Sequence, residues 1–313
     1  MKKTLKLLLP VVIALAVLTA CGGNEEKKPE QQEFKGEPTI SLFINDTGEK
    51  KQIKLEEYLV GVVAAEMEPT WPENALAAQA ILARTFTMEN IASGRVKKLH
   101  GADASTSVEE FQAYDPSRIN DNVRKAVEST RGQVIKYNGD YVKGWFAACC
   151  GGVTANAVEG LDWRKTQTPY IKAGLQDGCL EVTTPENKKW VATIPLDQVR
   201  AAVQKTVGQD PGNITTVEVA QWGPSGRAQQ IKVGNVQLSG PGFRLAVGSE
   251  VMRSTLIKDI RVEGNNLVIT GQGFGHGVGM CQWGANKMAT EGKSPEEIVK
   301  FYYQDVTIDK LWQ

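Results

Sequence analysis

The N-terminal segment of this chain is unsuited to a folded core. Lys2 and Lys3 precede an apolar run from Leu5 to Leu18. That run is shorter than the ~20 residues of a membrane-spanning helix. A positive start followed by a short apolar stretch and small residues is typical of a secretory signal. We therefore expect residues 1–20 to be a signal peptide and the globular fold to begin further along.

The signal ends at residues 18–21, Leu18-Thr19-Ala20-Cys21, which resemble a bacterial lipobox. We expect Cys21 to be lipidated and to become the mature N-terminus. The alternative is an ordinary cysteine that follows an uncleaved anchor. Several acyl chains would hold the protein at the outer face of the cytoplasmic membrane, because a single chain binds only reversibly.

The next segment is polar. Residues 22–33 contain no large apolar side chain, and such a segment cannot bury enough surface to fold. We expect residues 21–37 to be a disordered tether and residues 38–313 to fold as one large domain or two small ones. The chain has 36 Lys and Arg against 36 Asp and Glu residues. Because no net positive field exists, nucleic acid is not an expected partner.

Two predicted helices open the folded part. The first runs from Leu55 to Met67. Its residues at steps of three and four share one face, and these are Leu59, Val62, Val63 and Glu66. Residues 70–73 then show a Thr-x-x-Glu capping pattern with a proline in the first turn, which predicts that a second, alanine-rich helix begins there.

The remaining predicted elements are shorter. We expect strands at 39–46 and 51–55, a loop at 94–120, a helix at 122–130, a hairpin at 132–148 with an Asn138-Gly139 turn, helices at 196–207 and 295–303, and mostly short strands at 214–272. The prediction is an α+β fold, with an N-terminal helical pair that carries an acid, a strand-rich region and a glycine-rich cleft motif.

Glu66 is the residue on the apolar helix face that could carry chemistry. A desolvated carboxylate is costly to ionise, so it should be paired or stay protonated. A carboxyl protonated near pH 7 can act as a general acid. The alternative is a buried network in which Glu66 pairs with Arg84 or Gln79 of the second helix and does no chemistry.

Two long blocks carry a resemblance to a known family. The first consists of residues 55–67 and 75–85, and the second is the glycine-rich block 273–285. Shorter matches lie between them in order, including 112–114 and 150–154. Over residues 38–308 the chain resembles the stage II sporulation protein D family.

The resemblance implies a lytic transglycosylase that cuts peptidoglycan glycan strands, with Glu66 as catalytic acid/base. It also implies a cell-wall amidase and other engulfment proteins as partners during sporulation. Some proteins resembling this family are amidase enhancers, so a non-catalytic wall-binding enhancer is the rival hypothesis. A solute-binding lipoprotein is a third, but two similar α/β lobes are not indicated.

Five residues are predicted to contact the glycan. They are Gln79, Arg84, His276, Gln282 and Trp283. The glycines of block 273–285 allow close backbone approach, and Trp283 could stack on a sugar face. The alternative is that this block is a tight corner needed only for folding.

Four cysteines remain besides Cys21. We first expect Cys150 to pair with Cys179, because the neighbours Cys149 and Cys150 are poorly placed to bridge each other and Cys281 lies in the glycine-rich block. A zinc site is the alternative, but no Cys-x-x-Cys spacing is present. The prediction is structural thiols or a disulfide, with no metal and no other cofactor.

Two departures from the family pattern concern metal and histidine. Members often carry a histidine ahead of the Gly-Gly pair, where this chain has residues 146–150 without one. Some relatives carry cysteines and a histidine suited to a metal near the Gln-x-Tyr segment, where this chain has Ser105, Thr106 and Ser107 beside His100. We expect His100 to be a solvated or hydrogen-bonded loop residue.

Overall fold

The computed structural model describes residues 35–313. The predicted signal peptide, lipidated Cys21 and most of the predicted tether lie outside the described residues. The helices are α1 Leu55–Glu66, α2 Glu73–Ser93, α3 Arg95–His100, α4 Asp121–Ser129, α5 Ala157–Leu161, α6 Cys179–Val182, α7 Pro185–Lys188, α8 Leu196–Val207, α9 Gly240–Val247, α10 Gln282–Thr290 and α11 Pro295–Tyr302, with a 3-10 turn η1 at Pro116–Arg118.

The strands form several small sheets, so the α+β prediction is confirmed. They are β1 Thr39–Phe43, β2 Lys50–Lys54, β3 Ala104–Ser105, β4 Gln133–Tyr137, β5 Asp140–Tyr141, β6 Phe146–Ala147, β7 Trp190–Pro195, β8 Val217–Trp222, β9 Ala228–Val233, β10 Val236–Ser239, β11 Ile257–Glu263, β12 Asn266–Gly271, β13 Met280–Cys281 and β14 Thr307–Lys310. Across residues 35–313, no helix combines the length and apolar character that crossing a membrane requires.

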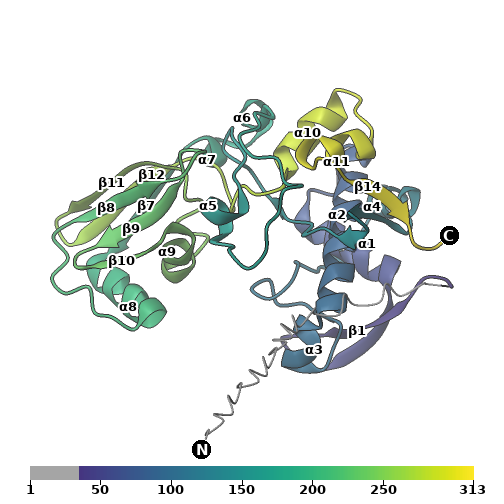
Figure 1. The fold of residues 1–313 in the computed structure, drawn as a ribbon, viewed down its shortest axis with the longest axis horizontal. Helices are drawn as coiled ribbons and strands as arrows, with labels where there is room; N and C mark the ends of the chain where they lie inside the picture. The colour runs from purple at the N-terminus through teal and green to yellow at the C-terminus, as the bar shows by residue number, and fades with distance from the viewer. Residues whose placement is uncertain (1–34) are drawn as a thin grey trace, which may run out of the picture. The chain divides into compact units, whose positions relative to one another are not determined.

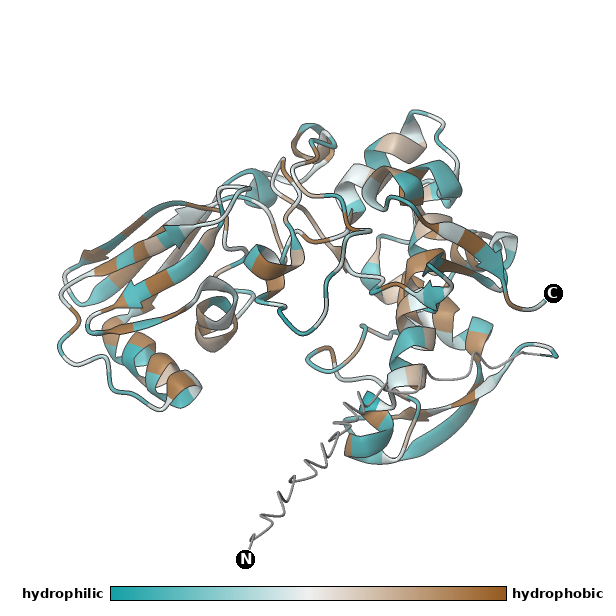
Figure 2. Ribbon diagram, viewed as in Figure 1, coloured by the Kyte–Doolittle hydropathy of each residue, from teal (hydrophilic) through white to brown (hydrophobic). Residues whose placement is uncertain are grey.

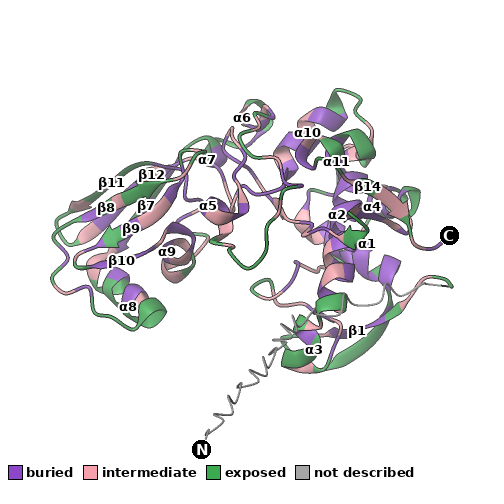
Figure 3. Ribbon diagram, viewed as in Figure 1, coloured by how far each residue is buried: buried purple, intermediate pink, exposed green. Residues whose placement is uncertain are grey.

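The first hydrophobic core surrounds α2. This helix contacts α1, α4, α10, α11 and β4 (Figure 1), and most of it is buried in Figure 3. Its alanines allow neighbouring helices to approach closely on several sides. The helix ends at Gly94, whose φ of 66° is left-handed.

The start of α2 differs from the prediction. The helix begins at Glu73 and its N-cap is Pro72, with no side-chain capping bond. The carbonyl of Pro72 accepts the N–H groups of Ala75 and Leu76 at 2.9 and 3.3 Å. The capping box proposed for Thr70 is therefore wrong, because proline, with φ held near its helical value, starts the helix two residues later.

A second hydrophobic core lies between residues 190 and 269. Two three-stranded sheets, ordered β10-β9-β8 and β11-β12-β7, contribute to it together with α8 and α9. Along β7 the residues Trp190, Ala192 and Ile194 are buried while Val191 and Thr193 are exposed. Apolar and polar residues also alternate along neighbouring strands in Figure 2. This alternation confirms the predicted strand-rich region.

The Asn138-Gly139 turn is confirmed. It joins β4 to β5 in an antiparallel hairpin, and Asn138 and Gly139 have φ values of 50° and 86°. Both are positive, as a two-residue hairpin turn requires. The second strand is much shorter than predicted, because the end of the predicted strand, Phe146–Ala147, forms the separate strand β6 and pairs with β13 instead of β4. The expected loop at 94–120 contains α3, β3 and η1, so that prediction is only partly correct.

A parallel pair of short strands joins two distant segments. Met280 of β13 pairs with Phe146 of β6, and Cys281 pairs with Ala147. An isolated bridge between Cys149 and Phe274 extends this contact. The glycine-rich block therefore lies directly against residues 146–150.

Candidate functional site

Glu66 is the last residue of α1 and is partly buried. The helix stops there because Met67 adopts an extended conformation, with φ −126° and ψ 164°, two residues before Pro69. The predicted helix end is therefore correct to one residue. At this end of a helix the backbone dipole presents its negative pole, which disfavours an ionised carboxylate.

The surroundings of Glu66 favour the protonated carboxyl. Burial raises the pKa of Glu66 to about 6, although hydrogen bonds from the Ala113 backbone and the Gln282 side chain oppose that rise. The Ala113 N–H donates to Oε1 at 2.8 Å. A carboxyl with this pKa can both give and accept a proton near neutral pH.

Three of the residues predicted for the site come together. Gln79 on α2 and Gln282 at the start of α10 are both buried, and the Gln282 Nε2 lies 3.4 Å from the Gln79 Oε1. Gln282 also hydrogen-bonds to Glu66. Among residues 35–313 the Gln79 Nε2 has no hydrogen-bond partner. An unpaired buried amide next to an acid has N–H groups that can bond a hydroxyl or acetamido oxygen of a ligand.

Trp283 lies beside this group. Its ring packs edge-on against Trp71, with ring centroids 4.6 Å apart and planes at 61°. Trp71 lies two residues before the start of α2 and is partly exposed. Trp71 is a site residue that the sequence pattern does not reveal, since residues 70–73 match a helix start. Its aromatic side chain next to an apolar helix was the available signal.

His276 faces other partners. Burial, followed by the charges of Arg244 and Arg227, lowers the pKa of His276 to about 3. Its Nδ1 accepts a hydrogen bond from the Val278 N–H at 3.0 Å, so the neutral ring carries its proton on Nε2. A neutral imidazole held this way can position backbone but cannot supply charge near pH 7.

The glycines around His276 are needed for close packing. A Cβ on Gly277, with φ 74°, would stand 2.1 Å from the Arg227 Nη2. A Cβ on Gly279, with φ 72°, would stand 2.0 Å from the Trp145 carbonyl oxygen. The glycine-rich block 273–285 is thus a tightly packed turn of the backbone. It leads directly into Gln282, which contacts Glu66.

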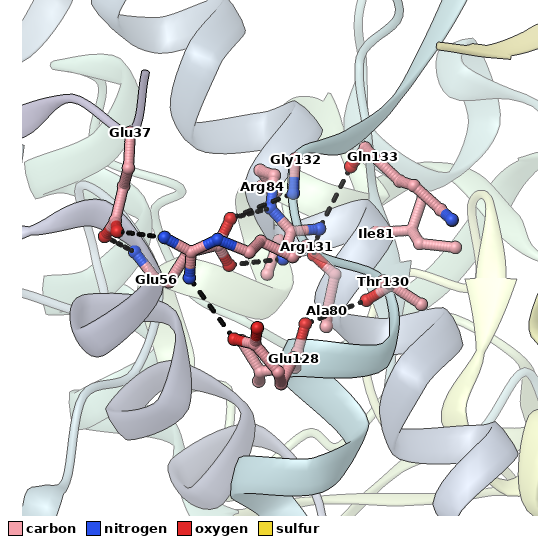
Figure 4. Close-up of polar contacts among 12 residues, drawn as sticks. Glu37, Glu56, Ala80, Ile81, Arg84, Glu128, Thr130, Arg131, Gly132 and Gln133 are labelled. Carbon is pink, nitrogen blue, oxygen red and sulfur yellow. Dashed lines mark hydrogen bonds and ion pairs between the residues drawn. The ribbon is translucent and has the colours of Figure 1, made fainter. Parts of the chain in front are cut away.

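Arg84 lies in a different environment from Glu66. It is fully buried, and its Nε and Nη2 bond the two carboxylate oxygens of Glu56 at 3.0 and 2.6 Å (Figure 4). Its Nη1 donates to the Gln133 carbonyl at 3.0 Å. Glu56 also accepts bonds from the Gly132 N–H and the Trp312 indole at 3.0 and 2.9 Å. Arg84 therefore connects α2 to α1 through Glu56 and to β4 through Gln133. It could contact a ligand only if these hydrogen bonds were broken.

The cysteines expected to pair are neighbours without a bond. The sulfurs of Cys150 and Cys179 lie 3.5 Å apart, against ~2.05 Å in a disulfide. Cys149, Cys150, Cys179 and Cys281 are all free and buried. His100 bonds Glu110 Oε2 at 2.8 Å and stacks on Phe43, so it is a hydrogen-bonded residue at the end of α3.

A broad surface hollow lies beside α5. Its volume is about 750 Å³, and its lining includes Trp163, Lys165 and Pro224. The ammonium groups of Lys143 and Lys165 lie 5.2 and 5.5 Å from the Trp163 ring centroid. Glu66 is not part of this lining. The acid and the hollow are therefore separate features.

Comparison with known proteins places the chain in a family. Residues 45–137 match the SpoIID family, described as stage II sporulation protein, and residues 174–279 match a domain family of unknown function, DUF8618. The first match contains α1 and α2, and the second contains most of the second core.

Full-length relatives extend this likeness. Stage II sporulation protein D of Bacillus amyloliquefaciens is 30% identical over 97% of this chain and 92% of its own length. An uncharacterized protein of Brachyspira hyodysenteriae is 32% identical over 82% of this chain and 67% of its own. The amidase enhancer of Bacillus subtilis is 27% identical over 80% of this chain and 40% of its own. The chain belongs to the stage II sporulation protein D family.

Proposed function

We propose that this protein is a lytic transglycosylase that cleaves the β-1,4 bond between N-acetylmuramic acid and N-acetylglucosamine in peptidoglycan. The observation that carries the proposal is Glu66. It is a partly buried carboxyl with a pKa raised to about 6 by burial, next to two buried amides and a tryptophan. Family membership supports a cell-wall role in sporulation.

A single carboxyl is sufficient for this reaction. Glu66 donates its proton to the glycosidic oxygen as the C1–O bond of the muramic residue breaks, and then accepts the proton of the C6 hydroxyl as that oxygen bonds to C1. The products are a 1,6-anhydro end and a free hydroxyl on the leaving sugar. Glu66 is protonated again. Hydrolases that use water need a second carboxylate, whereas here the substrate supplies the nucleophile.

The neighbours of Glu66 have supporting roles in the proposal. The Ala113 N–H, 2.8 Å from Oε1, fixes the orientation of the carboxyl and stabilises its ionised form between the two proton transfers. Gln79 and Gln282 offer amide groups for the sugar substituents. Trp283 and Trp71 provide an aromatic surface for a pyranose face.

The setting of the reaction is part of the proposal. We infer a lipid anchor at Cys21 and a position at the outer face of the cytoplasmic membrane, where peptidoglycan is accessible. Metabolic labelling with a fatty-acid probe tests the anchor: label should enter the wild type and be absent from Cys21→Ala. Label in Cys21→Ala would refute the anchor.

The rival is a non-catalytic enhancer that binds peptidoglycan and stimulates an amidase. The likeness to the amidase enhancer of Bacillus subtilis favours it. The two proposals differ in their products. An enhancer releases stem peptides only together with an amidase, whereas a transglycosylase makes anhydro ends alone.

Product analysis separates them. Purified full-length protein is incubated with peptide-free and with peptide-bearing glycan strands, and the products are analysed by mass spectrometry. We expect 1,6-anhydro-muramic ends in at least one incubation and none with Glu66→Gln. The matched control is Glu57→Gln, an exposed carboxylate on the same helix, which should be as active as the wild type. Strands left uncut in every incubation would exclude the enzyme and favour the enhancer.

A further inference from the structure

A cluster of buried thiols lies next to the candidate site without belonging to it. The Sγ atoms of Cys150, Cys179 and Cys281 and a carboxylate oxygen of Asp177 all lie within 4.8 Å of one another, and all four residues are buried. They come from three separate segments, which follow β6, surround the start of α6 and precede α10. We propose that this cluster is a structural zinc site, with three thiolates and Asp177 as ligands.

The spacing of the sulfurs fits a shared metal ion. The sulfurs of Cys150 and Cys179 are 3.5 Å apart, and the Cys281 sulfur lies within 4.8 Å of both. Thiolates ~2.3 Å from one tetrahedral zinc ion stand roughly 3.8 Å from each other. The carboxylate oxygens of Asp177 lie 3.5 and 3.4 Å from the Cys150 sulfur. Both kinds of distance far exceed a covalent bond and place the donors around one point.

Hydrogen-bond donors around the cluster would stabilise negative charge on its sulfur and carboxylate atoms. Cys281 is the N-cap of α10, and its sulfur accepts N–H bonds from Cys150 at 3.2 Å and from Gly284 at 3.4 Å. Such bonds stabilise thiolates bound to metal. Asp177 Oδ2 accepts the Tyr302 hydroxyl at 2.8 Å, and Oδ1 accepts the Cys179 N–H at 3.0 Å. The donors are thereby oriented by further hydrogen bonds.

A buried cation offsets part of the negative charge of such a site. Zinc with four anionic ligands carries a net charge of −2. Arg227 is fully buried, and its Nη2 donates to the Cys150 carbonyl at 2.6 Å. Its Nη1 donates to the Val153 carbonyl at 3.0 Å. The charge of buried Glu159 already acts on Arg227, and a zinc thiolate centre would add a second counter-charge to this buried guanidinium.

The sequence contains no contiguous zinc motif, so its spacing predicts no metal. The structure brings the donors together over separations of 27, 29 and 131 residues. Closing loops of that length constrains the unfolded chain strongly, so the ion would stabilise the fold. It would also hold Cys281, the residue before Gln282, and so position α10 beside Glu66.

Metal analysis of the full-length protein tests the proposal without any activity measurement. The protein is purified through a tag without histidines, and metals are quantified by mass spectrometry. We expect about one zinc ion per chain, and a fall to background in Cys179→Ser and Cys281→Ser. Two controls should keep their zinc: Cys21→Ser, a cysteine outside the cluster, and Val203→Ala, a core residue of α8.

A chelation experiment on the wild type avoids reliance on variants that fail to fold. A strong chelator should lower the thermal midpoint by on the order of 10 °C, and added zinc should restore it while magnesium should not. X-ray absorption of the zinc protein should show three sulfur neighbours and one oxygen. Four sulfurs would overturn the assignment of Asp177 and put Cys149 in its place.

Other outcomes would overturn the site itself. Protein without metal whose four thiols all react with a thiol reagent after denaturation would show free cysteines. Protein without metal and lighter by two hydrogen atoms would show a disulfide. Iron with visible absorbance would show a cluster of another kind. Since none of these measurements involves glycan, their failure is distinguishable from failure of the transglycosylase proposal.

Discussion

The carboxylate oxygen Oε1 of Glu66 accepts a hydrogen bond from the backbone N–H of Ala113 at 2.8 Å. This bond connects the end of α1 to the segment before η1, 47 residues further along the chain. It opposes the rise in pKa that burial causes at Glu66. The residue therefore remains able to ionise, as a group that both donates and accepts a proton must.

Glu66→Gln should abolish most of the activity while preserving the fold. The amide keeps the size of the side chain but has no proton to transfer, so the rate should fall on the order of 10² to 10⁴. The formation of anhydro ends over time measures this, beside Glu57→Gln as control. A variant with wild-type turnover and a lowered thermal midpoint would show that Glu66 is structural.

The activity should depend on pH through Glu66. The protonated carboxyl starts the reaction, and its pKa is about 6, so kcat/KM should fall about tenfold per pH unit above that value. A profile measured on soluble glycan oligomers checks this. If kcat/KM is flat from pH 5 to pH 8, the acid is another group or its pKa is unperturbed.

The raised pKa of Glu66 should also make the free energy of unfolding depend on pH. Burial raises the pKa of Glu66 in the folded protein from its ordinary value of 4.5 to about 6. A protonated Glu66 therefore contributes stability that is fully present below pH 4.5 and is lost as pH rises through about 6, on the order of 1–2 kcal/mol. Glu66→Gln should remove this part of the pH dependence. Urea unfolding of both proteins at several pH values provides the comparison.

Several helix limits and one turn could be predicted from the pattern of apolar and turn-forming residues along the sequence. The apolar steps of α1, the limits of α8 at Leu196–Val207 and the Asn138-Gly139 turn depend on neighbours within a few residues, and each was predicted closely. Glu66 is conspicuous as a carboxylate on an apolar helix face, but it is the family resemblance that makes it the catalytic candidate. Propensity and periodicity are sufficient for such features.

Long-range partners could not be predicted in this way. Arg84 is predicted to contact Glu66 or the substrate, yet it pairs with Glu56, which is 28 residues away and directly follows the second predicted strand. Both glutamates lie on α1, and only the packing of α2 decides between them. The cysteine cluster likewise depends on how three segments far apart in the sequence pack together. The spacing of the cysteines along the chain does not predict that packing.

Arg84→Ala should destabilise the protein far more than it affects chemistry. Removal of the guanidinium leaves Glu56 as a buried charge without its partner, at a cost of ~3–5 kcal/mol. The double variant Glu56→Gln with Arg84→Met should recover part of the loss, because no unpaired charge remains. Calorimetry measures both, and Arg200→Ala, which breaks an exposed pair with Asp210, should leave the thermal midpoint unchanged.

Activity per folded molecule completes the Arg84 test. If Arg84 acts only through the scaffold, KM for glycan at a temperature well below the midpoint should equal that of the wild type. A raised KM in a fully folded Arg84→Ala protein would instead support the predicted contact with substrate.

Trp283→Ala should weaken glycan binding. The ring stands edge-on to Trp71 beside Gln282 and is partly exposed, so it can stack on a sugar face. Loss of that surface should raise KM roughly tenfold with a smaller effect on kcat, since Glu66 and its hydrogen bonds stay in place. Trp283→Phe should restore most of the affinity because a ring is still present. Trp222→Ala, an exposed tryptophan on β8, is the control. Unchanged KM together with a lowered thermal midpoint would show that Trp283 serves only the packing of α10 on α2.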